Sequence, residues 1–159
     1  MIEFKLLLLV IVANAAPLLG TAIFRHRFGT PLDFGLRLFD GRPLIGSHTT
    51  IRGVLLAVGC SAVAAPLLAL PVAVGAIVGL AAMAGDILSS FCKRRLGIAP
   101  GGKAPGLDQL PESLLPLWAV AGDYDLPATM VLGLGLGFML FDMAASQLLY
   151  RLKLREQPH

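Results

Sequence analysis

Long apolar runs dominate the pattern of residues along this chain. Four of them, at 4–24, 53–70, 72–92 and 126–150, contain almost only hydrophobic side chains, glycine and small hydroxyl residues. About 20 such residues in a helix span a hydrocarbon core about 30 Å thick. The pattern therefore predicts four membrane-spanning helices. A fifth run, 113–122, is about half as long, and on its own it is ambiguous between a re-entrant segment and a short span.

The composition supports a membrane protein rather than a soluble one. Of the 159 residues, 56% are hydrophobic and only 14% are charged, which is too apolar for a soluble surface. The length suits one integral membrane domain covering 1–159. The net charge of +3 does not indicate a nucleic-acid partner, because the cations gather in particular loops.

The distribution of these cations settles the expected topology. Five of the 13 Lys and Arg residues lie in the loop 25–52, four lie in 93–103, and three lie in the tail after residue 150. Cytoplasmic loops carry such an excess, so both loops and the tail are expected in the cytoplasm. The short run must then cross, which places the N-terminus outside and the C-terminus inside the cell membrane. We expect an all-α polytopic bundle of five transmembrane helices with two irregular cytoplasmic loops, 25–52 and 93–112.

One intramembrane carboxylate lies at the cytoplasmic end of the third run. On a helix, Asp86, Ser90 and Lys93 share a face, since they are spaced i, i+4 and i+7. A carboxylate at this depth is costly unless it faces a cavity, a cation or a metal ion. Two interpretations stay open: an internal salt bridge to an arginine of the first loop, or a ligand of a divalent metal in a cleft open to the cytoplasm.

A second carboxylate, Asp108, follows in the loop 93–112, with Glu112 four residues later. Aspartate is common in loops of this kind, so Asp108 alone could be a turn former. Two aspartates near one rim, among cations, also suit Mg²⁺ held by carboxylates and substrate phosphates. The cations have a simpler explanation as well, as a topology signal or a patch for anionic lipid.

The first loop ends in GSHTTIRG, where small polar residues stand between two glycines. His48, Thr50 and Arg52 could there form an anion cradle at the start of a helix. This is not a Walker A motif, and His48 could equally be a structural group. Two polar residues inside spans complete the candidates. Asn14 is expected to face the protein interior, and Asp142 suits structural pairing and a substrate site equally well.

Several of these segments together resemble a known family. The spacing GD-x3-S-x2-KR, at Gly85, Asp86, Ser90, Lys93 and Arg94, resembles the signature of membrane CTP:phosphatidate cytidylyltransferases, the CDP-diacylglycerol synthases. The small archaeal-type branch, the CDP-archaeol synthases, is the closer match. It is similar in ANAAP of the first span, DGRPLIGSHTTIRG of the first loop, GD…KRRLGI and PG…LDQLPE. The branch usually has a lysine where this chain has Thr49.

The resemblance implies an activity and a set of roles. A lipid phosphate, archaeol-type or phosphatidate, would attack the α-phosphorus of CTP and give a CDP-lipid and pyrophosphate. Asp86 and Asp108 would hold Mg²⁺ and act in catalysis with Lys93. The CTP phosphates would be bound by the remaining candidates, which are His48, Thr50, Arg52, Ser90 and Arg94.

A second function class is also open to a chain of this composition. A small membrane transporter or lipid-binding protein without catalytic activity would use Asp86 and Asp142 along a polar pathway. It would spread polar residues over several spans and place functional loops on both sides. The polar residues gather at the cytoplasmic side instead, which favours an enzyme acting at the membrane surface. A small bundle of this kind can also form a homodimer.

Overall fold

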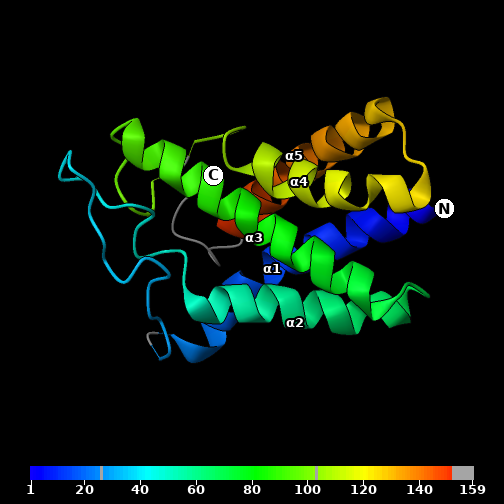
Figure 1. Ribbon diagram of the computed structural model, residues 1–159, viewed down its shortest axis with the longest axis horizontal. Coiled ribbons are helices and arrows are strands. Elements are labelled where there is room, and N and C mark those ends of the chain that lie inside the picture. Colours follow the sequence, from blue (N-terminus) through cyan, green and yellow to red (C-terminus); the bar gives the residue numbers. More distant parts are fainter. Residues whose placement is uncertain (26, 103, 152–159) are drawn as a thin grey trace.

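The computed structural model describes residues 1–25, 27–102 and 104–151, with side chains described up to residue 147 (Figure 1). Its helices are α1 (Ile2–Phe24), α2 (Ile51–Leu67), α3 (Val72–Arg95), α4 (Gln109–Ala121) and α5 (Ala128–Arg151), with one turn of 3-10 helix, η1 (Gly122–Tyr124). Within these ranges the extended pairing amounts to two isolated bridges. The predicted all-helical fold with five helices is confirmed.

Three helices are long and apolar enough to span a membrane: α1, α3 and the part of α5 described as Ala128–Gln147. The other two are shorter, since α2 has 17 residues and α4 has 13. Full crossings by α2 and α4 therefore stay predictions. So do the domain limits 1–159. Of the tail cations, Lys153 and Arg155 lie outside the described residues.

Helix boundaries differ from the expected spans at the two loops. Helix α3 continues past residue 92 to Arg95, so Lys93 is helical rather than part of a loop. Cations in a last turn interact favourably with the negative end of a helix, which explains the extension. Helix α4 begins at Gln109 rather than at residue 113, which places Asp108 at its N-terminus. The described irregular part of the second loop is therefore 96–102 and 104–108.

Helix α3 lies at the centre of the bundle, packed against α2 on one side and α4 on the other, while α5 lies outside α4 (Figure 1). Small residues allow this packing: a Cβ added to Gly79 would lie 2.7 Å from the Cα of Val58 on α2. An apolar core fills the half of the bundle away from the two loops. It is formed by Leu6, Leu9, Val10, Ala65, Leu70, Val74, Val78, Leu117, Val120, Val131 and Phe138.

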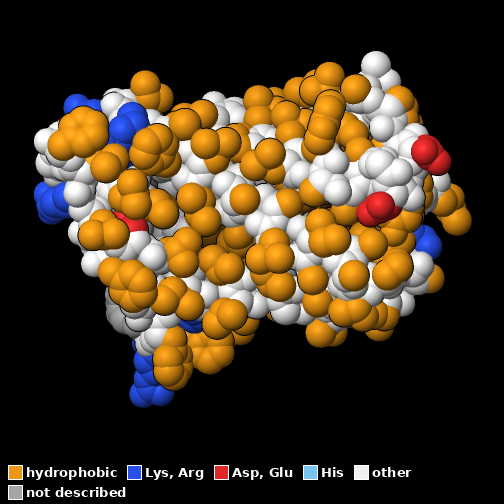
Figure 2. Space-filling view, viewed as in Figure 1, with side chains coloured by type: hydrophobic (Ala, Val, Ile, Leu, Met, Phe, Trp, Pro, Cys, Tyr) orange, Lys and Arg blue, Asp and Glu red, His pale blue; other side chains and the backbone are white. Residues whose placement is uncertain are grey.

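The outside of the bundle is apolar, and its cations lie mainly at one end. Side chains such as Leu67 and Leu140 are exposed by 84% and 64%. Figure 2 shows hydrophobic side chains over the flanks and most of the Lys and Arg side chains at the end where the first loop lies. Because an exposed apolar belt of this extent belongs in lipid, the protein is a membrane protein.

The first loop has a defined path set by Asp33. Its carboxylate accepts the backbone N–H groups of Gly35, Ile45 and Gly46, at 2.8–2.9 Å. Burial acts to raise the pKa of Asp33, but these three hydrogen bonds outweigh it and bring the pKa below its usual value. An ionised Asp33 thus fixes the stretch that leads into GSHTT.

Candidate active site

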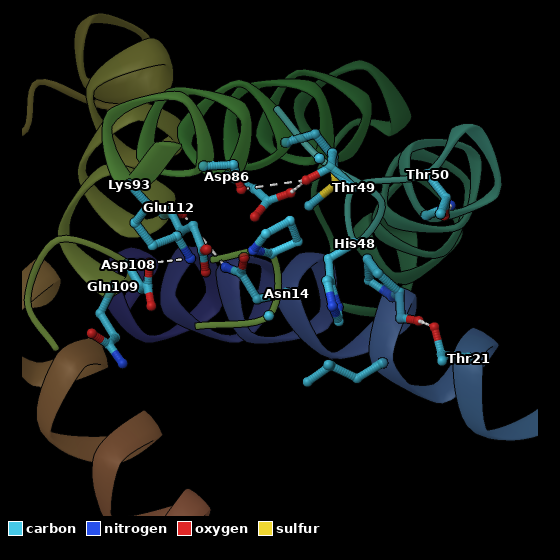
Figure 3. Close-up of a pocket in the computed structure, with 18 of the residues that line it drawn as sticks. Asn14, Thr21, His48, Thr49, Thr50, Asp86, Lys93, Asp108, Gln109 and Glu112 are labelled. Carbon is cyan, nitrogen blue, oxygen red and sulfur yellow. Dashed lines mark hydrogen bonds and ion pairs between the residues drawn. The ribbon is translucent and has the colours of Figure 1, made fainter. Parts of the chain in front are cut away.

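A pocket of about 720 Å³ opens where the two loops meet the helices (Figure 3). All five helices contribute to its lining, and its volume is in the range of small-molecule sites. Its polar lining consists of Asn14, Thr21, His48, Thr49, Thr50, Asp86, Ser90, Lys93, Arg94, Asp108, Gln109, Glu112, Asp142 and Ser146. Seven of the eight site residues predicted from the sequence are among them, and Arg52 is not.

The face of α3 predicted from the sequence is the face that lines the pocket. Asp86, Ser90 and Lys93 all lie on it, one turn after another. The Oδ2 atom of Asp86 accepts a hydrogen bond of 2.8 Å from the Thr49 hydroxyl. The same hydroxyl lies 3.4 Å from Ser90 Oγ. Thr49 is buried, so the first loop closes over Asp86 and fixes its carboxylate.

Gly85 lets α4 pack directly on α3 beside this carboxylate. A Cβ at position 85 would overlap the carbonyl oxygen of Pro111 and lie 2.7 Å from the Cα of Glu112. The absence of a side chain therefore brings the first turn of α4, with Glu112, next to Asp86. Asn14 Nδ2 joins α1 to this turn through the carbonyl of Glu112, at 3.5 Å, as well as bonding to Val10 at 2.9 Å.

Among the described carboxylates that line the pocket, Asp108 forms an ion pair. Its Oδ1 atom lies 2.7 Å from Lys93 Nζ, with both side chains less than one-fifth exposed. Its Oδ2 atom accepts the backbone N–H of Ala104 at 3.0 Å. Among the described residues Asp86 has no ion-pair partner, so the salt bridge to a loop arginine is absent there. Lys93, on the same face of α3 as Asp86, pairs with Asp108 instead.

The two arginines assigned to the nucleotide lie in different places. Arg94 is only 3% exposed and lines the pocket. Arg52 instead donates to the backbone carbonyls of Arg25 and Arg27 and to the Thr21 hydroxyl. Carbonyls at the end of a helix have no partner within the helix, and Arg52 satisfies those that follow α1. Arg52 therefore does not line the pocket.

His48 and Thr50 line the pocket from the first loop. His48 is exposed, and a Cβ at Gly101 would lie 2.7 Å from its Nε2 atom. Gly101 has φ +82°, so glycine meets both the steric and the backbone requirement where the second loop approaches His48. Thr50 is the N-cap of α2, and its hydroxyl accepts the N–H of Gly53 at 3.1 Å.

Sequence reasoning left three of these residues without a role. Thr49 bonds to Asp86, Glu112 packs beside it, and Gln109 Nε2 donates to Asp142 Oδ2 at 3.1 Å. Thr49 lies inside GSHTT, and its place in that motif is the feature of the sequence that points to a role in the pocket. The Gln109 contact joins α4 to α5 and depends on helix packing that no local pattern reveals.

A metal ion in this pocket would need ligands in addition to the protein side chains. In the described part of the chain, no group of three or more His, Cys, Asp or Glu side chains is arranged to hold one. Mg²⁺, however, usually takes one or two carboxylates together with substrate phosphates and water. Asp86 and Asp108 supply two carboxylates in one pocket, with Glu112 beside them, so the residues present fit Mg²⁺ bound together with a phosphate substrate.

Comparison with known proteins gives one consistent result. The family model "CarS-like: CDP-archaeol synthase" matches residues 2–72 and 67–159. The CDP-archaeol synthase of Methanopyrus kandleri is 40% identical over 139 residues, covering 82% of this chain and 80% of its own. That of Aeropyrum pernix is 35% identical over 160 residues, covering 96% of this chain and 88% of its own.

A solved structure agrees with the sequence matches. It is described as an intramembrane enzyme for archaeal membrane lipids biosynthesis. It superposes with a TM-score of 0.77 at 34% identity, covering 89% of this chain and 90% of that chain. The two chains therefore share the arrangement of helices on which the pocket depends. The protein belongs to the CarS-like family of CDP-archaeol synthases.

Proposed function

We propose that the pocket is the site at which CMP is transferred from CTP to a lipid phosphate. The protein is a membrane cytidylyltransferase that makes a CDP-lipid, as its family indicates. An oxygen of the lipid phosphate forms the new bond to the α-phosphorus of CTP. The bond from that phosphorus to the β-phosphate breaks, and pyrophosphate leaves. The names of the relatives favour an archaeol-type phosphate over phosphatidate.

One observation carries the proposal. The same pocket holds four carboxylates, Asp86, Asp108, Glu112 and Asp142, and two cations, Lys93 and Arg94. The cations suit the negative charge of a triphosphate, which grows at the leaving pyrophosphate as the bond breaks. The Thr49 hydroxyl, which lies next to Ser90 Oγ, holds the Asp86 carboxylate in one orientation. A lipid phosphate is ionised at neutral pH, so its attack needs no strong base.

Mg²⁺ is the cofactor that the donor set fits. Asp86 and Asp108 would hold it, and it would neutralise charge on the transferring phosphate group. Lys93 forms an ion pair with Asp108 in this structure. We infer that its side chain turns toward the phosphates when the nucleotide binds. His48 and Thr50 lie on the loop side of the pocket, where they would contact the nucleotide.

The pocket also reaches the lipid. Its lining includes Leu18 and Leu19 of α1, which are 57% and 61% exposed on the side of the bundle, and Met143 of α5. A lipid phosphate could thus approach from the bilayer, between α1 and α5, while CTP comes from water. This geometry fits a reaction between one substrate anchored in lipid and one dissolved.

The orientation of the protein follows from its charges. We propose that the pocket, both loops and the C-terminus face the cytoplasm and that the N-terminus lies outside, because the loops carry most of the cations. We also propose that the protein forms a homodimer, since three helices leave large apolar faces open to lipid or to a second copy.

Loss of either aspartate tests the proposal. Asp86→Asn and Asp108→Asn should each lower the Mg²⁺-dependent conversion of labelled CTP into lipid-extractable product by about 100-fold or more. The purified full chain in lipid vesicles would be assayed with ether-linked and ester-linked lipid phosphates in parallel. The ether-linked substrate is expected to react faster.

The control variant is Asp123→Asn, because Asp123 is an exposed acid in η1, away from the pocket. It should keep full activity. Full activity in both Asp86→Asn and Asp108→Asn would refute the assignment of the metal and the catalytic role, even if the enzyme activity itself were confirmed.

A further inference from the structure

The first loop contains a small hairpin with exposed side chains at its tip. Leu38 N–H donates to Arg42 at 3.0 Å and Leu44 N–H donates to Leu36 at 2.8 Å, which closes the hairpin 36–44. Gly41, at φ +73°, forms its turn. Phe39 at the tip is 100% exposed, with Leu36 at 60%.

This hairpin is held in place rather than free. The Arg95 guanidinium on α3 forms an ion pair with Asp40 and donates to the carbonyl of Pro43. In the other direction, Arg42 Nη1 donates to the backbone carbonyl of Arg95 at 2.6 Å. These contacts fix the hairpin to the end of a membrane-spanning helix. The exposure of Phe39 is therefore a built feature of the loop.

The charges around the hairpin leave the loop positive. Asp40 is satisfied within the protein by Arg95, and Asp33 is satisfied by backbone N–H groups. Arg37 is exposed, as are Arg25 and Arg27 at the start of the same loop. Exposed aromatic and aliphatic residues interleaved with arginine are typical of segments that lie in a membrane interface and attract anionic lipid.

The position of the hairpin also fits contact with the membrane interface. The loop starts where α1 ends and returns at the start of α2, and Figure 1 shows it at the end of the bundle beside the last turn of α3. The ends of spanning helices lie at the level of the lipid headgroups. Figure 2 shows hydrophobic and basic side chains side by side at this end. A phenylalanine there meets lipid without any change of fold.

We propose that the hairpin 36–44 is a membrane-interface anchor that inserts Phe39 among the lipids and places Arg37 against the phosphates of anionic lipid. The anchor rests on the helical bundle alone and does not depend on the proposed reaction. It holds the loop that carries Thr49 at the level of the membrane surface, where the lipid substrate lies.

Tryptophan fluorescence can locate the tip directly, because the chain has a single tryptophan, Trp118. The test variant is Phe39→Trp combined with Trp118→Phe, reconstituted as the full chain in vesicles. We expect quenching by lipids brominated near the headgroup to approach that of wild-type Trp118, which is 59% exposed on α4. Quenching by aqueous acrylamide should be much weaker than for N-acetyltryptophanamide in the same buffer.

The contribution of charge is tested in the same background with Arg37→Gln. Phosphatidylglycerol in place of phosphatidylcholine should shift the emission of the Phe39→Trp reporter to shorter wavelength, and Arg37→Gln should reduce that shift. Strong acrylamide quenching with no effect of brominated lipid would overturn the anchor. A reporter shielded from both quenchers, in a way that depends on the protein-to-lipid ratio, would also overturn it and indicate contact with a second copy. Neither readout needs catalysis, so failure of the anchor and failure of the proposed reaction are distinguishable.

Discussion

The two halves of the helical bundle are built by opposite means. In the half away from the loops, side chains such as Leu9, Val78 and Leu117 are fully buried among other apolar groups. In the half at the loops, the buried side chains include Thr49 of the first loop and Ser90 and Arg94 of α3, and the hydroxyls of Thr49 and Ser90 lie 3.4 Å apart. Helices α1, α3 and α4 belong to both halves.

The difference shows how the protein keeps carboxylates inside a membrane. Close packing in the apolar half fixes the angles and separations of the helices, and interiors packed in this way deform little. The polar half can then hold Asp86 and Asp108 in one open pocket without collapsing onto them. Substitutions in the apolar half should therefore affect stability, and those in the polar half should affect turnover.

Gly85→Val should lower both stability and turnover, because Gly85 lies where α4 packs on α3 beside the carboxylates. Its Cβ would overlap the backbone of Pro111, so α4 must move away from α3. We expect a loss of about 3 kcal/mol in the free energy of unfolding. Activity should fall by about 100-fold, because displaced carboxylates no longer match the substrate. Denaturant unfolding in detergent and the CTP assay measure the two effects.

The control for this substitution is Gly137→Val on α5, where a Cβ would meet no atom within 4 Å. It should leave both quantities nearly unchanged. A Gly85→Val protein with normal stability and turnover would show that the contact between α3 and α4 is dispensable.

Leu117→Ala should lower stability without changing turnover. Leu117 is completely buried in the core and does not line the pocket. Its removal leaves a void that costs about 2 kcal/mol in the free energy of unfolding. Turnover per folded molecule should be unchanged. A large fall in kcat with normal stability would contradict the assignment of this half to stability.

Thr49→Val, in the polar half, should lower turnover with little change in stability. Valine keeps the shape of threonine but cannot donate to Asp86 Oδ2. We expect kcat to fall about 10-fold, as when a group that orients a metal ligand is removed, with the free energy of unfolding little altered. Thr49→Ser restores the hydroxyl and should recover most of the rate. Equal losses in the valine and serine variants would indicate a role of shape alone.

Ser61→Ala should have the smallest effect. Ser61 Oγ is buried on α2 and has no hydrogen-bond partner among the described residues. Removing an unsatisfied hydroxyl should change the free energy of unfolding by less than about 0.5 kcal/mol, toward higher stability. Thermal unfolding in detergent measures this change. A loss of stability as large as that expected for Leu117→Ala would contradict the prediction, because it would mean that the hydroxyl has a hydrogen-bond partner in the folded protein.

Much of this arrangement could be predicted from periodicity and charge. Apolar runs gave the helices to within about four residues, because lipid imposes a length and a polarity on any span. Helical spacing placed Asp86 and Lys93 on one face, which lines the pocket. These features are local, so the sequence contains them directly.

The contacts between distant segments could not be predicted in this way. The pairing of Lys93 with Asp108, rather than with Asp86, depends on the path of the second loop. The sequence places Arg52 at the nucleotide because it is a cation at the start of a helix, beside small hydroxyl residues. It instead bonds to carbonyls that follow α1, which only the folded loop brings near. The role of Gly85 likewise follows from the approach of two backbones.

The ion pair between Lys93 and Asp108 has a thermodynamic consequence for substrate uptake. A lone carboxylate or ammonium group at this depth would be costly, and pairing the two removes most of that cost in the free enzyme. If Lys93 binds the phosphates as proposed, uptake of an anionic ligand is an exchange, in which the lysine leaves one negative partner for another. The affinity measured for such a ligand reports the difference between two charge pairs, so breaking the resting pair with Asp108→Asn should tighten binding of a bare triphosphate while it abolishes turnover.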